Sequence, residues 1–71
     1  PQKIRQAIKI RIAEFALSPF SPRLNNHGLA GKWQGYRSIN ITGDWRAIFA
    51  EGNDYDLVKF VAVGIHSQLY H

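Results

Sequence analysis

The chain has 71 residues, which is room for one small domain whose core is marginal in size. Hydrophobic residues make up 45% of it and charged residues 20%, a balance that excludes intrinsic disorder. It contains no cysteine, so disulfides and thiolate metal sites are excluded, and no apolar run approaches the roughly 20 residues of a membrane span. We therefore expect no membrane partner and a cytoplasmic protein.

Residues 2–17 are predicted to form a helix, because they contain no Gly or Pro and precede Ser18-Pro19. One apolar stripe on this helix is expected to face a sheet; it comprises Ile4, Ile8, Ile12 and Phe15. A second stripe, formed by Ile10, Ala13 and Leu17, predicts a further packing partner, either an absent N-terminal helix or another protein. Arg11 lies within the first stripe, and the only explanation from the sequence is that its aliphatic stem packs on the apolar face while its charged end reaches the solvent.

The rest of the chain is predicted to be a loop followed by antiparallel hairpins. The loop covers 18–31, strands cover 33–41, 45–51 and 55–63, and turns rich in Gly, Asn and Asp separate them. Residues 57–63 barely alternate, which predicts a strand covered on both faces. The fold class is therefore α+β: one domain over 1–71, with a helix packed on an antiparallel sheet of at least three strands.

The positive charge has two possible explanations. Nine Lys and Arg against five Asp and Glu give a net charge of +4, and three of the acids lie within 51–56. The basic residues alternate along the chain with four aromatic residues, Trp33, Tyr36, Trp45 and Tyr70. This mixture is typical of a surface that binds RNA, whose phosphates pair with the positive charges and whose bases stack on the aromatic rings. On composition alone, a solvated basic face over an aromatic core explains the pattern equally well.

Two histidines are candidates for proton transfer. His27 lies beside Gly28 in the predicted loop, and His66 follows the last predicted strand, whereas the terminal His71 is given no role. Two distant histidines and one turn aspartate do not have zinc-ligand spacing, so no metal or other cofactor is expected. Metal-free RNA cleavage stays chemically open, because it needs only a base for the 2′-OH, an acid for the 5′-oxygen and fixed cations.

Two stretches of the sequence resemble a known family. The stretch HGLAGKWQGYRSINITGDWRAIF followed by FVAVGIHSQLY resembles the YafQ branch of the RelE/ParE superfamily of bacterial toxins, over about residues 24–70. The resemblance implies ribosome-dependent mRNA cleavage by a RelE/ParE-like domain, with the ribosome, mRNA and a cognate antitoxin as partners. The family's N-terminal strand and helix have no counterpart in this chain.

The resemblance also implies roles for individual residues. His27, His66 and Asp44 would take part in catalysis, with Trp45 helping to place the substrate, Tyr70 positioning the scissile nucleotide and Arg46 holding phosphate. Core packing of Trp45 and capping of the sheet by Tyr70 are the alternatives from the residues themselves.

Two positions depart from the family pattern. Asn40 stands where a further catalytic histidine is common, and it can bind phosphate or ribose but cannot transfer protons near neutral pH. Ala62 stands where relatives carry a phosphate-binding arginine, a loss for which Lys32, Arg37 and Arg46 are candidates to compensate. These losses leave open a non-enzymatic, ParE-like or degenerate toxin that acts by protein binding. A general RNA-binding module is a third reading.

Overall fold

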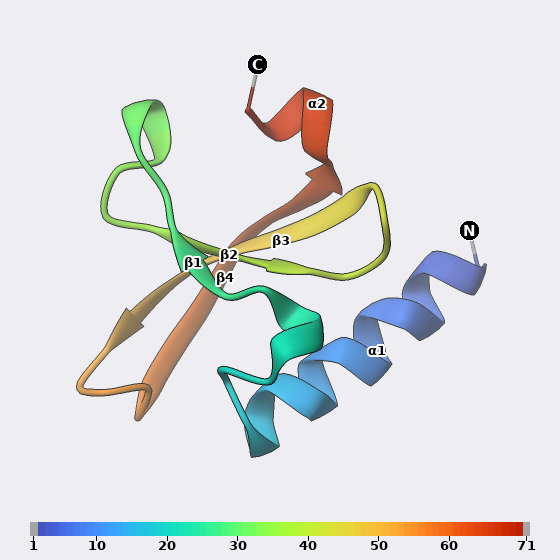
Figure 1. The fold of residues 1–71 in the computed structure, drawn as a ribbon, viewed down its shortest axis with the longest axis horizontal. Helices are drawn as coiled ribbons and strands as arrows, with labels where there is room; N and C mark the ends of the chain where they lie inside the picture. The colour runs from blue at the N-terminus through green and yellow to red at the C-terminus, as the bar shows by residue number, and fades with distance from the viewer. Residues whose placement is uncertain (1, 71) are drawn as a thin grey trace.

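The computed structural model describes residues 2–70, in which a long helix lies across an antiparallel sheet of four strands (Figure 1). The sheet order is β1-β2-β3-β4, so each strand pairs with its neighbour in sequence. This confirms the predicted α+β class; Pro1 and His71 lie outside the described residues. In chain order the elements are α1 (Gln2–Leu17), η1 (Pro22–Leu24), β1 (His27–Gly28), η2 (Gly31–Trp33), β2 (Arg37–Asn40), β3 (Trp45–Gly52), β4 (Leu57–Ile65) and α2 (His66–Leu69), where η1 and η2 are 3₁₀ turns.

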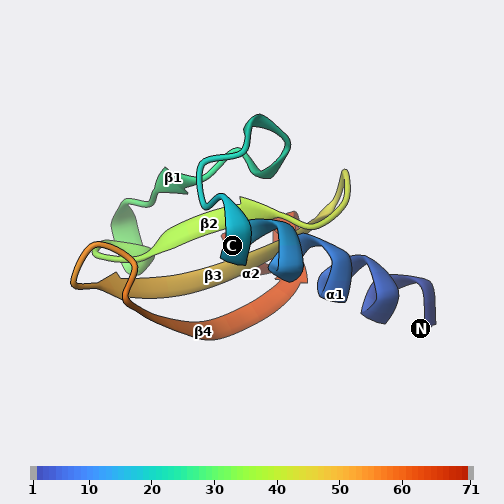
Figure 2. The same cartoon turned by 90° about the horizontal axis from the view of Figure 1, so that it is seen from below.

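Helix α1 has the bounds that its sequence predicts, and Ile8 and Phe15 of the predicted stripe pack in the core. Phe15 is buried against the sheet, where its ring meets that of Phe49 edge-to-face with centroids 4.9 Å apart. The second stripe is exposed, with Ile10 at 55% and Leu17 at 90% of full accessibility. Figure 2 shows that the N-terminal turns of α1 extend past the end of the sheet. Arg11 has a partner that the sequence did not indicate, because its Nη1 donates to Glu14 at 3.3 Å.

The core lies between α1 and one face of the sheet. Its buried members are Phe15, Leu24, Ile39, Ile41, Ala47 and Phe49. Leu24 is fully buried although it falls in the predicted loop 18–31, and that segment also contains η1 and the two-residue strand β1. The loop prediction is therefore incomplete, because Pro22 and the left-handed Asn25 shape a compact turn that inserts Leu24 into the core.

The predicted start of the strand over 33–41 is wrong. A strand was expected from residue 33, but η2 occupies Gly31–Trp33 and β2 begins only at Arg37. Gly35 has φ +92, a conformation that interrupts a strand and that glycine adopts without steric cost. The aromatic residues on either side of Gly35 gave this segment a misleading strand-like composition.

The last strand is shifted and is not covered on both faces. It spans Leu57–Ile65, because Asn53, Asp54 and Tyr55 all have positive φ and form a longer turn than expected. Along β4, exposed and half-buried residues alternate, and Leu57 is 69% exposed. Since β4 is the edge strand of the described sheet, its outer side has no strand partner there. The apolar run was therefore misread as a strand covered on both faces.

Candidate functional site

The short helix α2 is anchored to three separate parts of the chain. The Trp33 indole Nε1 donates to the Leu69 carbonyl at 2.7 Å, and the His66 backbone N–H donates to the Asp44 carbonyl at 2.8 Å. In addition, the Tyr70 hydroxyl donates to Oγ of Ser38 at 2.8 Å. Residues from η2, from β2 and from the β2–β3 turn thus determine where the closing histidine motif lies.

Gly64 allows α2 to lie close to the sheet. A Cβ added at this position would lie 3.2 Å from Cδ2 of Leu69, so the leucine side chain occupies the space that a larger residue would need. The neighbouring His66 ring packs edge-to-face on Tyr70, with centroids 4.5 Å apart. The ring of His66 is therefore oriented by a tyrosine that is itself hydrogen-bonded to the sheet.

The residues predicted to act on RNA fall largely on the sheet face opposite α1. Ile39 and Ile41 point into the core beneath α1, so alternation along β2 directs Ser38 and Asn40 to the other face. His27 pairs with Ser38, and Asn40 pairs with Arg46; directly opposed residues share a face. Tyr70 meets Ser38 there. This shared face is called the α2 face below.

His27 is exposed, and one of its ring nitrogens is already committed. Its Nδ1 lies 2.8 Å from the carbonyl oxygen of Asn25. Because a carbonyl only accepts, Nδ1 must carry a proton in this arrangement, and in the neutral ring Nε2 then has the free lone pair. The contact fixes the tautomer that a general base at Nε2 requires.

Asp44 and Arg46 occupy the β2–β3 turn and its exit. Asp44 is exposed and touches His66 through its backbone carbonyl. The Arg46 Nη1 donates to the carbonyls of Thr42, Gly43 and Trp45, at 3.0 to 3.1 Å. One guanidinium nitrogen therefore stabilises the turn that carries Asp44, and the other two donate no hydrogen bond to residues 2–70.

Arg37 and Trp45 have mainly structural contacts. The Arg37 Nε donates to Oδ1 of Asn26 at 2.9 Å, and its guanidinium lies over the ring of Phe20. Trp45 packs against the core on the α1 side, opposite the α2 face. For both side chains the contacts support the packing role more directly than contact with a substrate.

The remaining predicted residues differ in exposure. Lys32 is exposed on η2, with its Nζ 5.8 Å from the centroid of the Trp33 ring. Asn40 is half-buried, and its Oδ1 is buried without a hydrogen-bond partner among residues 2–70. Ala62, opposite Ile48 on the α2 face, supplies no charge.

Three residues that position the site were not singled out from the sequence. These are Ser38, the buried acceptor for Tyr70; Trp33, as a donor to α2; and Asn26, which joins Arg37 to the hydroxyl of Tyr55 at 3.1 Å. No local sequence pattern indicates them, because Ser38 stands between Arg37 and Ile39 and each of these contacts joins residues far apart in the sequence.

Within residues 2–70 there is no group of three or more His, Cys, Asp or Glu side chains placed to hold a metal ion. Over the same residues, no helix combines the length and the hydropathy that a membrane crossing needs.

A family model and a curated protein sequence both match this chain. The family model described as "Bacterial toxin of type II toxin-antitoxin system, YafQ" matches residues 1–71. A Haemophilus influenzae protein named as a YafQ toxin is 36% identical over 52 residues, covering 70% of this chain and 51% of the relative. The chain thus spans about half the length of the curated relative it matches.

Solved structures show the same fold. Escherichia coli YafQ superposes with a TM-score of 0.78 at 22% identity, covering 94% of this chain and 74% of that one. A YoeB/ParE toxin from Agrobacterium tumefaciens gives 0.70 at 19% identity, covering 93% and 77%. The predicted RelE/ParE-like fold is therefore confirmed.

Proposed function

Because this chain belongs to the YafQ family of bacterial toxins of type II toxin–antitoxin systems, we propose that it is a ribosome-dependent mRNA endoribonuclease inhibited by a bound antitoxin. Residues 1–71 would act as one catalytic domain in the cytoplasm, with translated mRNA as substrate. The observation that carries this function is the shared α2 face: His27 is paired with the same Ser38 that accepts from Tyr70, against which His66 packs.

The proposed reaction is an acid–base transesterification. Nε2 of His27 takes the 2′-OH proton, the 2′-oxygen bonds to phosphorus, and the bond from phosphorus to the 5′-oxygen breaks. His66, which is exposed, serves as the general acid and gives a proton to that leaving oxygen, so the products are a 2′,3′-cyclic phosphate and a 5′-hydroxyl. The fixed tautomer of His27 supports its role as the base.

Positive charge would stabilise the transition state. Arg46 has the remaining donors of its guanidinium available beside Asn40, and Lys32 adds charge from η2. Asp44, whose backbone carbonyl accepts the His66 backbone N–H, would hold His66 in position at the start of α2. Tyr70 would present its ring edge to the scissile nucleotide while its hydroxyl stays bonded to Ser38.

The direct test uses translating ribosomes and a defined message. We expect the purified chain to cut the message only when it is being translated, and both His27→Ala and His66→Ala to lower the rate at least about a hundredfold. His71→Ala is the matched control and should retain full activity. Uncleaved mRNA with the unaltered chain would contradict the proposal.

The departures from the family pattern at Asn40 and Ala62 favour one alternative, a ParE-like or degenerate toxin relative that acts by protein binding alone. It predicts intact mRNA on translating ribosomes together with tight binding of the antitoxin. Cleavage that depends on His66 would exclude it.

A further inference from the structure

A polar hollow opens at the uncovered end of β2. It has a volume of about 260 Å³ and is lined by Arg11, Arg23, Asn40, Ile41, Thr42 and Gly43. It exists because β1 pairs only with Arg37 and Ser38, so the following residues of β2 lack a strand on that side. α1 and η1 contribute one arginine each to its wall.

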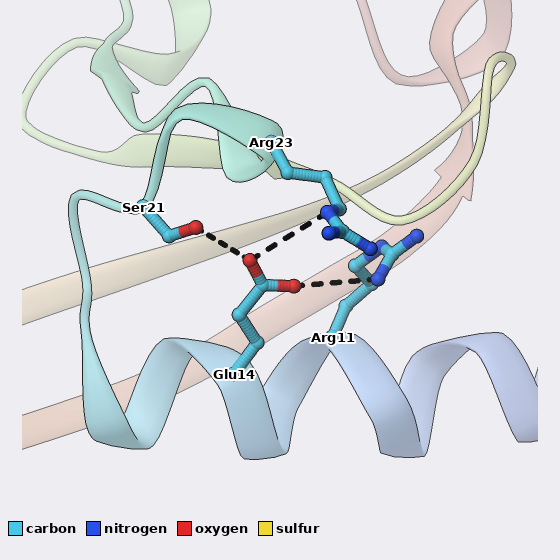
Figure 3. Close-up of polar contacts among 4 residues, drawn as sticks. All are labelled: Arg11, Glu14, Ser21 and Arg23. Atoms are coloured by element: carbon cyan, nitrogen blue, oxygen red, sulfur yellow. Dashed lines mark hydrogen bonds and ion pairs between the residues drawn. The ribbon is translucent and has the colours of Figure 1, made fainter.

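The charge of this hollow is not balanced. Arg11 and Arg23 share one carboxylate, that of Glu14, with N···O distances of 3.3 and 3.8 Å. Figure 3 shows both guanidinium groups converging above that carboxylate, which also accepts a hydrogen bond from Ser21. Two positive groups facing one negative group leave a net positive charge on the wall.

Arg23 is the more available of the two arginines. Its side chain is 66% exposed, and its Nε lies beyond hydrogen-bond distance from Glu14. No hydrogen bond joins its two terminal nitrogens to residues 2–70, so they can present the planar fork that matches a phosphate group.

Further donors line the same hollow. The Thr42 hydroxyl accepts from the Trp45 backbone N–H at 3.2 Å, which leaves its own hydrogen for a ligand. The backbone N–H of Gly43 has no acceptor among the described residues, and the space beside its Cα is open.

From this cluster we propose that the hollow binds one phosphate of an RNA strand, next to the scissile phosphate held on the α2 face. The identity of the strand rests on the proposed function, whereas the phosphate site itself does not. Asn40 links the two places, since it lines the hollow and pairs with Arg46.

Binding to the whole 71-residue chain tests the site, with a trinucleotide RNA carrying 2′-O-methyl groups, which block cleavage, as the probe. Arg23→Gln should weaken binding about tenfold and lower the salt dependence by about one ion, while Arg5→Gln, an equal loss of charge on the exposed side of α1, should change binding less than twofold. Equal effects of the two changes would overturn the site.

Glu14→Gln separates a ligand site from a purely structural clamp. It frees both arginines, so RNA binding should tighten severalfold even though the fold loses an ion pair. Unchanged or weaker binding by this variant would overturn the proposal. So would an acidic peptide of glutamates that competes with the trinucleotide at equal concentration, because the hollow would then be a protein-binding surface.

A failure of the proposed phosphate site can be distinguished from a failure of the proposed function. If His66→Ala abolishes cleavage while Arg23→Gln binds RNA normally, only the hollow is excluded. If the hollow binds RNA in an otherwise inactive chain, only the catalytic function is excluded.

Discussion

The hydroxyl of Tyr70, one residue beyond α2, donates to the Oγ of Ser38 in the middle of the sheet at 2.8 Å. Ser38 is fully buried, and its backbone pairs with His27. Ser38 is therefore linked to both candidate proton-transfer residues, because its backbone pairs with His27 and its hydroxyl accepts from Tyr70, on whose ring His66 packs.

Replacing Ser38 by Ala should lower the free energy of unfolding by about 1–3 kcal/mol, because the half-buried Tyr70 hydroxyl loses its acceptor. Tyr70→Phe should cost a similar amount by leaving the serine hydroxyl unpaired. The double variant should cost less than the two single changes together, as measured by urea denaturation. Strict additivity would show that the hydroxyls do not interact.

Gly64→Ala should destabilise the chain by about 1 kcal/mol or more, since the new methyl group meets the Leu69 side chain. Gly52→Ala is the matched control in β3, where nothing lies within 4 Å of the added Cβ. Thermal unfolding of both variants compares them. Adding Leu69→Ala to Gly64→Ala should remove the clash, and a clash that persists would mean that α2 packs differently.

Gly35→Ala should cost about 1–2 kcal/mol through the backbone alone, because φ is +92 while nothing crowds the position. Gly43→Ala has equally open space and no positive φ, so its unfolding free energy should stay within about 0.5 kcal/mol of the parent. Equal stability of the two variants would place Gly35 in an ordinary backbone conformation.

The pKa of Glu14 is lowered from 4.5, first by the hydrogen bond from Ser21 and then by the charges of Arg23 and Arg11. Since the folded pKa is depressed, the carboxylate contributes stability above about pH 4.5 and this contribution disappears as the pH falls through the lowered value. Melting temperatures of the parent chain and Glu14→Gln should therefore differ near neutral pH and converge in acid. A difference that persists at the lowest pH would exclude the linkage.

Local patterns were sufficient for the regular elements. The apolar spacing of α1 and the turn residues before Trp45 predicted a helix, its inner face and a hairpin, because these depend on residues close in sequence. The same patterns predicted strands that start at residues 33 and 55. Both starts are wrong, because Gly35 and Tyr55 have positive φ and the strands begin only after them. The motif resemblance supplied the histidines, which periodicity alone could not assign a role.

By itself, the sequence determined the fold class, the family and the chemical types available for catalysis, because composition, periodicity and ordered motifs are local properties of the chain. Tertiary structure alone decided that Tyr70 bonds to Ser38, that Arg37 binds Asn26, and that Arg11 and Arg23 share one carboxylate. Such contacts depend on strand register and on how α1 and α2 dock against opposite faces of the sheet, so their partners can be known only once the chain is folded.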